Sequence, residues 1–226
     1  MIARRWWAVA TLLVAAGGGI AVAIADREVP AAPAPAERPA LALLTSLPLV
    51  FGESFGLQSG GSAALSRLEQ RYSVRPIAVA DSASLKGQRL LLMAHPRAQP
   101  AEVLVELDQW VRDGGRVLLL ADPRLSWESQ RPIGDPLRPP PAFADTGLLA
   151  HWGVELTEGN DSELPVEAVT PGKLASRLCE VAANGFIARC PVGKGRATII
   201  ADADFLNGGQ KDLDLLMSEL ERLESR

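Results

Sequence analysis

The chain of 226 residues has few of the side chains that most often carry catalysis or bind metals. It contains only two histidines, His95 and His151, and only two cysteines, Cys179 and Cys190. Two cysteines alone cannot complete a four-ligand zinc site, and two histidines are a poor supply for a histidine-rich metal centre or a histidine-driven triad. These shortages lead us to expect no cofactor and no metal centre.

An excess of positive charge is also missing. The 23 lysines and arginines are outnumbered by 27 aspartates and glutamates, which gives a formal net charge of −4. Proteins that bind DNA or RNA neutralise phosphates with basic residues, so the charge balance predicts no nucleic-acid partner. The hydrophobic content of 47% and the charged content of 22% are ordinary for a globular protein. The length suggests one domain with appendages.

One long uncharged run is present, and it covers residues 6–25. At a rise of 1.5 Å per residue, a helix of this length spans about 30 Å, the thickness of the hydrocarbon layer of a bilayer. Arg4 and Arg5 precede the run, so the positive-inside rule places residues 1–5 in the cytoplasm and the rest of the chain outside. The run therefore predicts a single-pass membrane anchor. A cleaved signal peptide remains the alternative, because residues 23–25 read AIA.

A proline- and alanine-rich segment follows the uncharged run. Residues 26–40 read DREVPAAPAPAERPA, a composition typical of an extended, semi-rigid linker. The remaining residues, 41–226, have the composition of a folded domain. Whether the run is an anchor or a signal peptide, this domain is expected on the extracytoplasmic (periplasmic) side of the cell membrane.

Short apolar runs alternate with helical patterns from residue 41 onward. The run Leu90–Met93 is apolar throughout, as in parallel strands that are buried on both faces. Alternating strands and helices form right-handed βαβ units, so the sequence predicts an α/β fold with a doubly wound, mostly parallel sheet. The proline-rich stretch 123–145 has no periodicity and is expected to be a long loop. Strands are predicted at 41–46, 74–80, 89–94, 117–121 and 196–201, and helices at 63–72, 100–113 and 211–223.

A small β-hairpin is predicted late in the chain. Asn184-Gly185 is the preferred dipeptide of a two-residue type I′ turn, and counting outward from it places Cys179 opposite Cys190. Opposed residues of antiparallel strands have Cα atoms about 4.5–5.5 Å apart, a separation that a disulfide can bridge. An extracytoplasmic domain also lies in an oxidising compartment. We therefore expect a disulfide between these cysteines, with two unrelated buried thiols as the alternative.

Acidic residues recur where the predicted strands end. Asp122, Asp202 and Asp204 follow predicted strands, and Glu53 lies in the loop after the first strand. Open parallel sheets bind ligands outside the carboxyl ends of their strands, so we expect a ligand pocket there, beneath the 123–145 loop. The competing interpretation is that these aspartates cap helices or fix turns. Asp202 and Asp204 could also hold a hard cation through oxygen ligands.

The neighbouring residue Ser54 suggests a second kind of chemistry. Residues 52–56 read GESFG, which matches the G-x-S-x-G spacing of serine hydrolases. That motif needs a strand before the serine and a helix directly after it, whereas a Gly/Ser-rich loop follows here. An exported serine hydrolase that uses Ser54 therefore remains an alternative function. A cell-envelope glycan-binding module is another.

Three segments carry a resemblance to a known family. Residues 101–123 read AEVLVELDQWVRDGGRVLLLADP, residues 148–156 read LLAHWGVEL, and residues 193–207 read GKGRATIIADADFLN. They resemble auxiliary proteins of an uncharacterised ABC-type transport system, the gliding-motility-associated group. The resemblance implies a flavodoxin-like or glutamine-amidotransferase-like fold on a membrane tether, with an ABC permease and ATPase as partners. The implied function is a non-enzymatic accessory or ligand-sensing domain.

Overall fold

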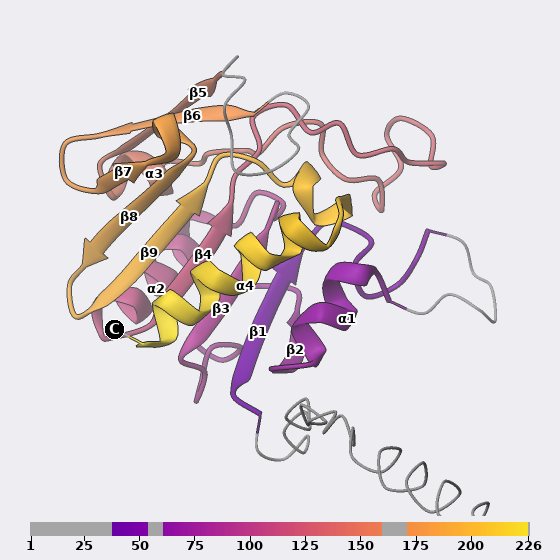
Figure 1. Ribbon diagram of the computed structural model, residues 1–226. Helices are drawn as coiled ribbons and strands as arrows, with labels where there is room; N and C mark the ends of the chain where they lie inside the picture. The colour runs from indigo at the N-terminus through magenta and orange to yellow at the C-terminus, as the bar shows by residue number, and fades with distance from the viewer. Residues whose placement is uncertain (1–37, 54–60, 160–170, 226) are drawn as a thin grey trace, which may run out of the picture. The chain divides into compact units, whose positions relative to one another are not determined.

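The computed structural model describes residues 38–53, 61–159 and 171–225 (Figure 1). The predicted anchor at 6–25, most of the predicted linker and Ser54 lie outside these residues. Within the described ranges, none of the helices combines the length and the apolar character needed to cross a bilayer.

Seven strands form the main sheet, in the order β2-β1-β3-β4-β9-β8-β7. The first five of these strands are parallel to one another. Their order, with β9 as the fifth strand, is the 2-1-3-4-5 order of flavodoxin-type doubly wound sheets. The predicted α/β fold with a mostly parallel sheet is therefore confirmed. The bounds of these strands are Ala40–Thr45 (β1), Ser73–Ile77 (β2), Leu90–Ala94 (β3), Arg116–Leu120 (β4) and Gly195–Ile200 (β9).

The predicted hairpin is present and extends this main sheet. Strands β7 (Glu180–Ala182) and β8 (Ile187–Val192) pair antiparallel with each other, and β8 pairs antiparallel with β9. At the turn, the Phe186 amide donates to the Ala183 carbonyl at 2.9 Å. The two residues between them, Asn184 and Gly185, both have positive φ, at 54° and 95°, as a type I′ turn requires.

A second, two-stranded sheet consists of β5 (Val154–Glu158) and β6 (Gly172–Ser176) in antiparallel pairing. The sequence predicted only a strand at 154–156 and a β-rich segment at 164–191. The second parallel strand, β2, ends at Ile77, three residues before the predicted end. Asp81 beyond it accepts a hydrogen bond from the Ser84 amide and so fixes a turn.

In the described ranges, four α-helices lie on both faces of the main sheet (Figure 1). Helices α1 (Ala63–Glu69) and α4 (Gln210–Ser225) cover one face, whereas α2 (Ala101–Arg112) and α3 (Leu148–His151) cover the other. Local sequence signals explain where two of them begin. The Ser62 side chain caps α1 by accepting from the Leu65 amide, and Pro100 directly precedes the first residue of α2.

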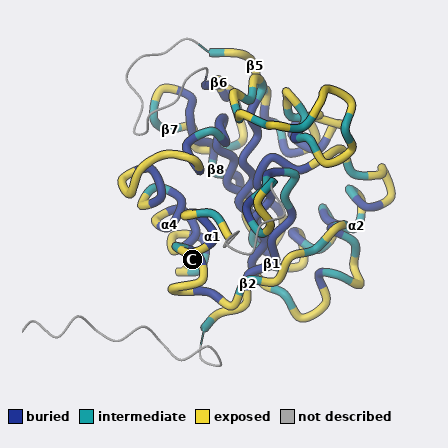
Figure 2. The backbone as a smooth tube through the Cα atoms, turned by 90° about the vertical axis from the view of Figure 1, so that its right-hand side faces the viewer, coloured by how far each residue is buried: buried dark blue, intermediate teal, exposed yellow. Residues whose placement is uncertain are grey.

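Two apolar layers result, one on each face of the sheet. Along β1, Leu41 and Leu43 pack in the layer of α1 and α4, whereas Ala42 and Leu44 pack in the layer of α2 and α3. Burial on both faces explains why β3 is apolar at every position and why the other central strands are mostly apolar. In Figure 2 these strands form the buried interior, and the exposed residues lie mostly on helices and loops.

A close backbone contact explains why position 195, in the segment 193–207 that resembles the family, is a glycine. A Cβ atom on Gly195 would lie 2.1 Å from the carbonyl oxygens of both Gly115 and Val111. Glycine therefore lets β9 begin directly against the end of α2 and the start of β4.

Candidate functional site

The carboxyl ends of the parallel strands meet at one edge of the sheet, where the long segment after β4 also lies (Figure 1). The predicted loop at 123–145 contains no helix or strand. Hydrogen bonds nevertheless hold it in place. The Leu125 amide donates to the Pro141 carbonyl at 2.9 Å, and the Phe143 amide donates to the Asp122 carbonyl at 2.7 Å.

Three of the predicted site residues come together at this edge. Asp122 lies two residues after β4, Asp202 lies two residues after β9, and Asp204 begins the short 3₁₀ helix η3 (Asp204–Asn207). Since Leu120 of β4 pairs with Ile200 of β9, the parallel register brings Asp122 and Asp202 to equivalent positions. One carboxylate oxygen from each of the three aspartates lies within 4.8 Å of the other two.

Most oxygens of this aspartate cluster (Asp122, Asp202 and Asp204) accept hydrogen bonds from backbone amides. Asp122 accepts from Arg124 at 2.8 Å and from Ala203 at 3.0 Å. Asp202 accepts through Oδ1 from Phe205 at 3.1 Å, and the two oxygens of Asp204 accept from Ser126 at 3.1 and 2.9 Å. These contacts support the interpretation that the aspartates fix turns.

One oxygen of the cluster is different. Asp202 has no solvent-exposed surface, and its Oδ2 atom has no hydrogen-bond partner. None of the three carboxylates forms an ion pair with a basic residue in the part of the chain that the structure describes. Two of the three carboxyl groups, those of Asp122 and Asp202, are thus buried without an ion-pair partner among the described residues.

Burial and mutual repulsion shift the protonation of the cluster. Burial raises the pKa of Asp202 to about 8, and the nearby charge of Asp122 contributes to this increase. Burial also raises the pKa values of Asp122 and Asp204, and backbone hydrogen bonds partly offset both increases. At neutral pH the Asp202 carboxyl therefore holds a proton unless another cation replaces it.

His95 lies beside the cluster, directly after β3. It is completely buried and has a left-handed backbone conformation, with φ of 47°. Its Nε2 atom lies 3.0 Å from the Pro140 carbonyl oxygen, and its Nδ1 atom has no partner. Burial lowers the pKa of His95, and the charge of His95 slightly offsets the increase in the pKa of Asp204.

Glu53 lies outside the cluster and instead lines a cavity. Its Oε2 atom accepts from the Gln130 amide at 2.7 Å, which ties the first loop to the 123–145 loop. The cavity has a volume of about 550 Å³, a size suited to a small ligand, and the loop contributes Arg131 and Leu137 to its wall. The structure therefore places a cavity at the expected edge of the sheet. Its other lining residues include Leu43, Thr45, Ser46, Leu47, Val50, Phe51 and Ile77.

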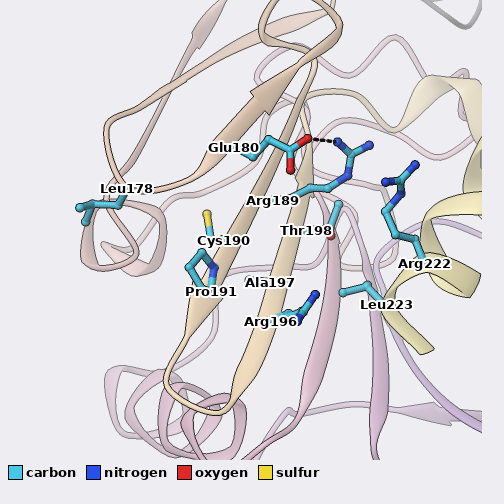
Figure 3. Close-up of a pocket in the computed structure, with 10 residues that line it drawn as sticks. All are labelled: Leu178, Glu180, Arg189, Cys190, Pro191, Arg196, Ala197, Thr198, Arg222 and Leu223. Atoms are coloured by element: carbon cyan, nitrogen blue, oxygen red, sulfur yellow. Dashed lines mark hydrogen bonds and ion pairs between the residues drawn. The ribbon is translucent and has the colours of Figure 1, made fainter. Parts of the chain in front are cut away.

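A second cavity, of about 390 Å³, lies against strands β7 to β9 and helix α4 (Figure 3). Sequence reasoning did not identify it, because distant segments contribute its walls. Three arginines line it, Arg189, Arg196 and Arg222. The charge of Arg189 is already paired, since its guanidinium bonds Glu219 at 2.6 Å and Glu180 at 3.3 Å.

The predicted disulfide is confirmed. Cys179 and Cys190 are bonded, with their Cα atoms 4.4 Å apart. The pairing of Glu180 with Arg189 is the predicted register of the hairpin, so the disulfide joins the next opposed positions. Since these are the only two cysteines of the chain, no thiol remains.

The strand order, the layered helices and the cavity at the carboxyl edge define a doubly wound α/β domain with a cavity where such sheets usually bind ligands. Residues 38–160, more than half of the chain, match the family model described as an ABC-type uncharacterized transport system. The chain belongs to this family of ABC transport auxiliary proteins. The resemblance identified from the sequence is thereby confirmed.

Solved structures with similar folds have low sequence identity to this chain. The cytoplasmic protein STM1381 from Salmonella typhimurium LT2 is 10% identical, with a TM-score of 0.49 over 81% of this chain and 98% of that one. The exo-beta-1,4-mannosidase from Opitutaceae bacterium strain TAV5 is 13% identical, with a TM-score of 0.44 over 83% of this chain and 35% of that one. The chain thus spans about a third of the mannosidase. No curated protein matches the sequence.

Proposed function

We propose that this protein is a membrane-anchored, extracytoplasmic accessory subunit of an ABC transport system and that it binds a ligand without catalysing a reaction. Membership of the ABC transport auxiliary family, through residues 38–160, is the observation that carries the proposal. The cavity lined by Glu53 and Arg131 is the proposed ligand site. The permease and ATPase of the transport system are the proposed partners.

The chemistry of the described residues supports binding over catalysis. Both cysteines are consumed by the disulfide, so a cysteine nucleophile is excluded. At the carboxyl edge, the ring of His95 contacts the Pro140 carbonyl, and the Ser46 hydroxyl donates to the His95 backbone carbonyl at 2.5 Å. Neither contact activates a nucleophile, because each ends on a backbone oxygen.

The disulfide also supports the proposed location. Disulfides persist in oxidising compartments and are rare in the cytoplasm. A bond between Cys179 and Cys190 therefore agrees with a domain outside the cytoplasmic membrane. The uncharged run at 6–25, preceded by Arg4 and Arg5, supplies the proposed anchor.

Site-specific photo-crosslinking tests the partnership. Leu137 lines the cavity and is 62% exposed, so a photoreactive amino acid at this position of the full-length chain is expected to capture the permease in intact cells. Val105 is similarly exposed on α2, on one face of the sheet, and serves as the matched control. Mass spectrometry identifies the captured chains. Equal capture from both positions, or capture of no transporter subunit from Leu137, would contradict the proposed partnership.

The proposed membrane topology predicts how reporter fusions behave. A reporter enzyme that is active only outside the cytoplasm, fused after Arg226, is expected to be active and to sediment with membranes. Replacing Arg4 and Arg5 by glutamate is expected to reduce this activity, because the positive charges that orient the span are lost. An inactive external reporter together with an active cytoplasmic reporter at the same position would show that the topology is wrong.

A further inference from the structure

We propose that Asp122, Asp202 and Asp204 form a binding site for a hard divalent cation such as Ca²⁺. Two independent observations support this site. The three carboxylates present oxygens that lie within 4.8 Å of one another. In addition, the completely buried Asp202 has an oxygen, Oδ2, that no donor satisfies. This inference goes beyond the proposed accessory function and does not depend on it.

The spacing of the oxygens is compatible with one shared ion. Two oxygens bound to one ion can be separated by at most twice the metal–oxygen distance. That limit is about 4.6–5.2 Å for Ca²⁺ and about 4.0–4.2 Å for Mg²⁺. Every pair of these oxygens is less than 4.8 Å apart, so each pair is close enough to share one Ca²⁺ ion.

The hydrogen bonds around the cluster leave lone pairs on the carboxylate oxygens free for an ion. Backbone amides of Arg124, Ala203 and Phe205 hold Asp122 and Asp202 in place. A carboxylate oxygen that accepts one such bond still has a second lone pair, and Oδ2 of Asp202 has both. Side chains fixed in this way lose little further freedom when an ion binds.

The charge of the cluster requires compensation. A buried carboxylate without a partner is costly, and three adjacent ones also repel each other. In the described part of the chain, no basic side chain pairs with any of the three. A divalent cation supplies the missing positive charge, whereas protons are the competing occupants that the experiment must distinguish.

The ion would connect three segments of the carboxyl edge. Asp122 follows β4, Asp202 lies two residues before η3, and Asp204 is the first residue of η3. Asp204 also accepts a hydrogen bond from the Ser126 amide of the 123–145 loop. That loop also contributes Arg131 and Leu137 to the ligand cavity. Cation binding is therefore expected to stiffen one wall of the cavity.

Calorimetric titration of the full-length chain with CaCl₂, after removal of metals by a chelator, tests the site. Three carboxylates completed by water predict a dissociation constant on the order of 0.1–1 mM, as in extracellular calcium modules. Saturating CaCl₂ is expected to raise Tm by roughly 5 °C or more relative to KCl at equal ionic strength. Asp204→Asn, which keeps an oxygen for the Ser126 amide, is expected to weaken binding at least ~10-fold. Asp145→Asn makes the same change outside the cluster and is expected to bind like the wild type.

Terbium luminescence gives a second measurement that does not depend on stability. Trp127 directly follows Ser126, whose amide is bonded to Asp204, and is therefore expected to sensitise Tb³⁺ bound in the cluster. We expect luminescence that CaCl₂ displaces, and that Trp127→Phe removes without changing the calcium-dependent rise in Tm. No heat and no Tm rise beyond the KCl control would overturn the proposal. So would equal Ca²⁺ affinity in wild type and in folded Asp202→Asn and Asp204→Asn variants.

Discussion

Replacing Asp202 by asparagine is expected to make the calcium-free protein more stable at pH 8, by an amount on the order of 3 kcal/mol. The variant keeps an oxygen that can accept from the Phe205 amide. The substitution also replaces a buried carboxyl group, which ionises only with difficulty, by an amide, which never carries a charge. In addition, the new amide can donate a hydrogen bond toward Asp122, which lies within the same cluster.

The expected pH dependence follows from the raised pKa of Asp202. The ordinary value is 3.8 and the folded value is about 8, so between these two pH values the unfolded chain loses a proton that the folded chain keeps. The contribution of the Asp202 carboxyl to the free energy of unfolding of the wild type is therefore fully present below pH 4 and is lost as the pH rises toward 8. The variant lacks this decrease, so the two proteins are expected to differ by less than about 1 kcal/mol at pH 4.

Urea unfolding at pH 4, 6 and 8 in the presence of a chelator measures this difference. Asp145→Asn is the matched control, since Asp145 also accepts from backbone amides, those of Gly147 and Leu149, but lies outside the cluster. Its stability relative to the wild type is expected to be the same at all three pH values. An Asp202→Asn effect that does not change with pH would show that Asp202 is ionised in the folded protein.

Removing the disulfide is expected to cost about 3 kcal/mol of unfolding free energy. The bond closes a loop with a sequence separation of 11, and a loop of this size restricts the unfolded chain by about that amount. The double variant Cys179→Ala, Cys190→Ala avoids leaving a buried thiol or hydroxyl, because Cys190 is only 3% exposed. Urea unfolding of both proteins gives the difference.

Reduction provides the control for this experiment. A reductant is expected to lower the stability of the wild type to nearly that of the double variant and to leave the double variant unchanged. Mass spectrometry after alkylation without reductant is expected to find no modified cysteine in the wild type. Two alkylated thiols, or equal stability of the two proteins, would refute the predicted contribution of the bond.

Several parts of the fold could be predicted because short-range patterns determine them. The run Leu90–Met93 is apolar at each position, since β3 is covered on both faces. The hairpin register followed from one dipeptide, Asn184-Gly185, because a two-residue turn leaves only one pairing of the flanking residues. The pairing of β5 with β6 was not predicted, although a strand at 154–156 and a β-rich segment at 164–191 were, since no dipeptide such as Asn-Gly indicates which strands pair.

The candidate site could be predicted only in part. Asp122 and Asp202 were expected at one edge, but their close approach depends on β4 being the direct neighbour of β9, which no local pattern reveals. His95 gave no signal beyond its place at the end of a strand, and its burial depends on Pro140 of a loop that is far away in the sequence. Glu53 was grouped with these aspartates, yet its contacts are with Gln130 and the cavity.

The two outer strands of the main sheet have a consequence for how the protein meets other chains. An unpaired strand edge is a template for a strand of another molecule. Here β2 carries Pro76, which has no amide hydrogen to offer, and at the opposite edge β7 has only three residues beside the disulfide. Both edges of the main sheet therefore resist edge-to-edge aggregation and the addition of a strand from another chain. Recognition of a partner would then depend on exposed side chains, such as Phe51 and Leu137 at the carboxyl ends of the strands.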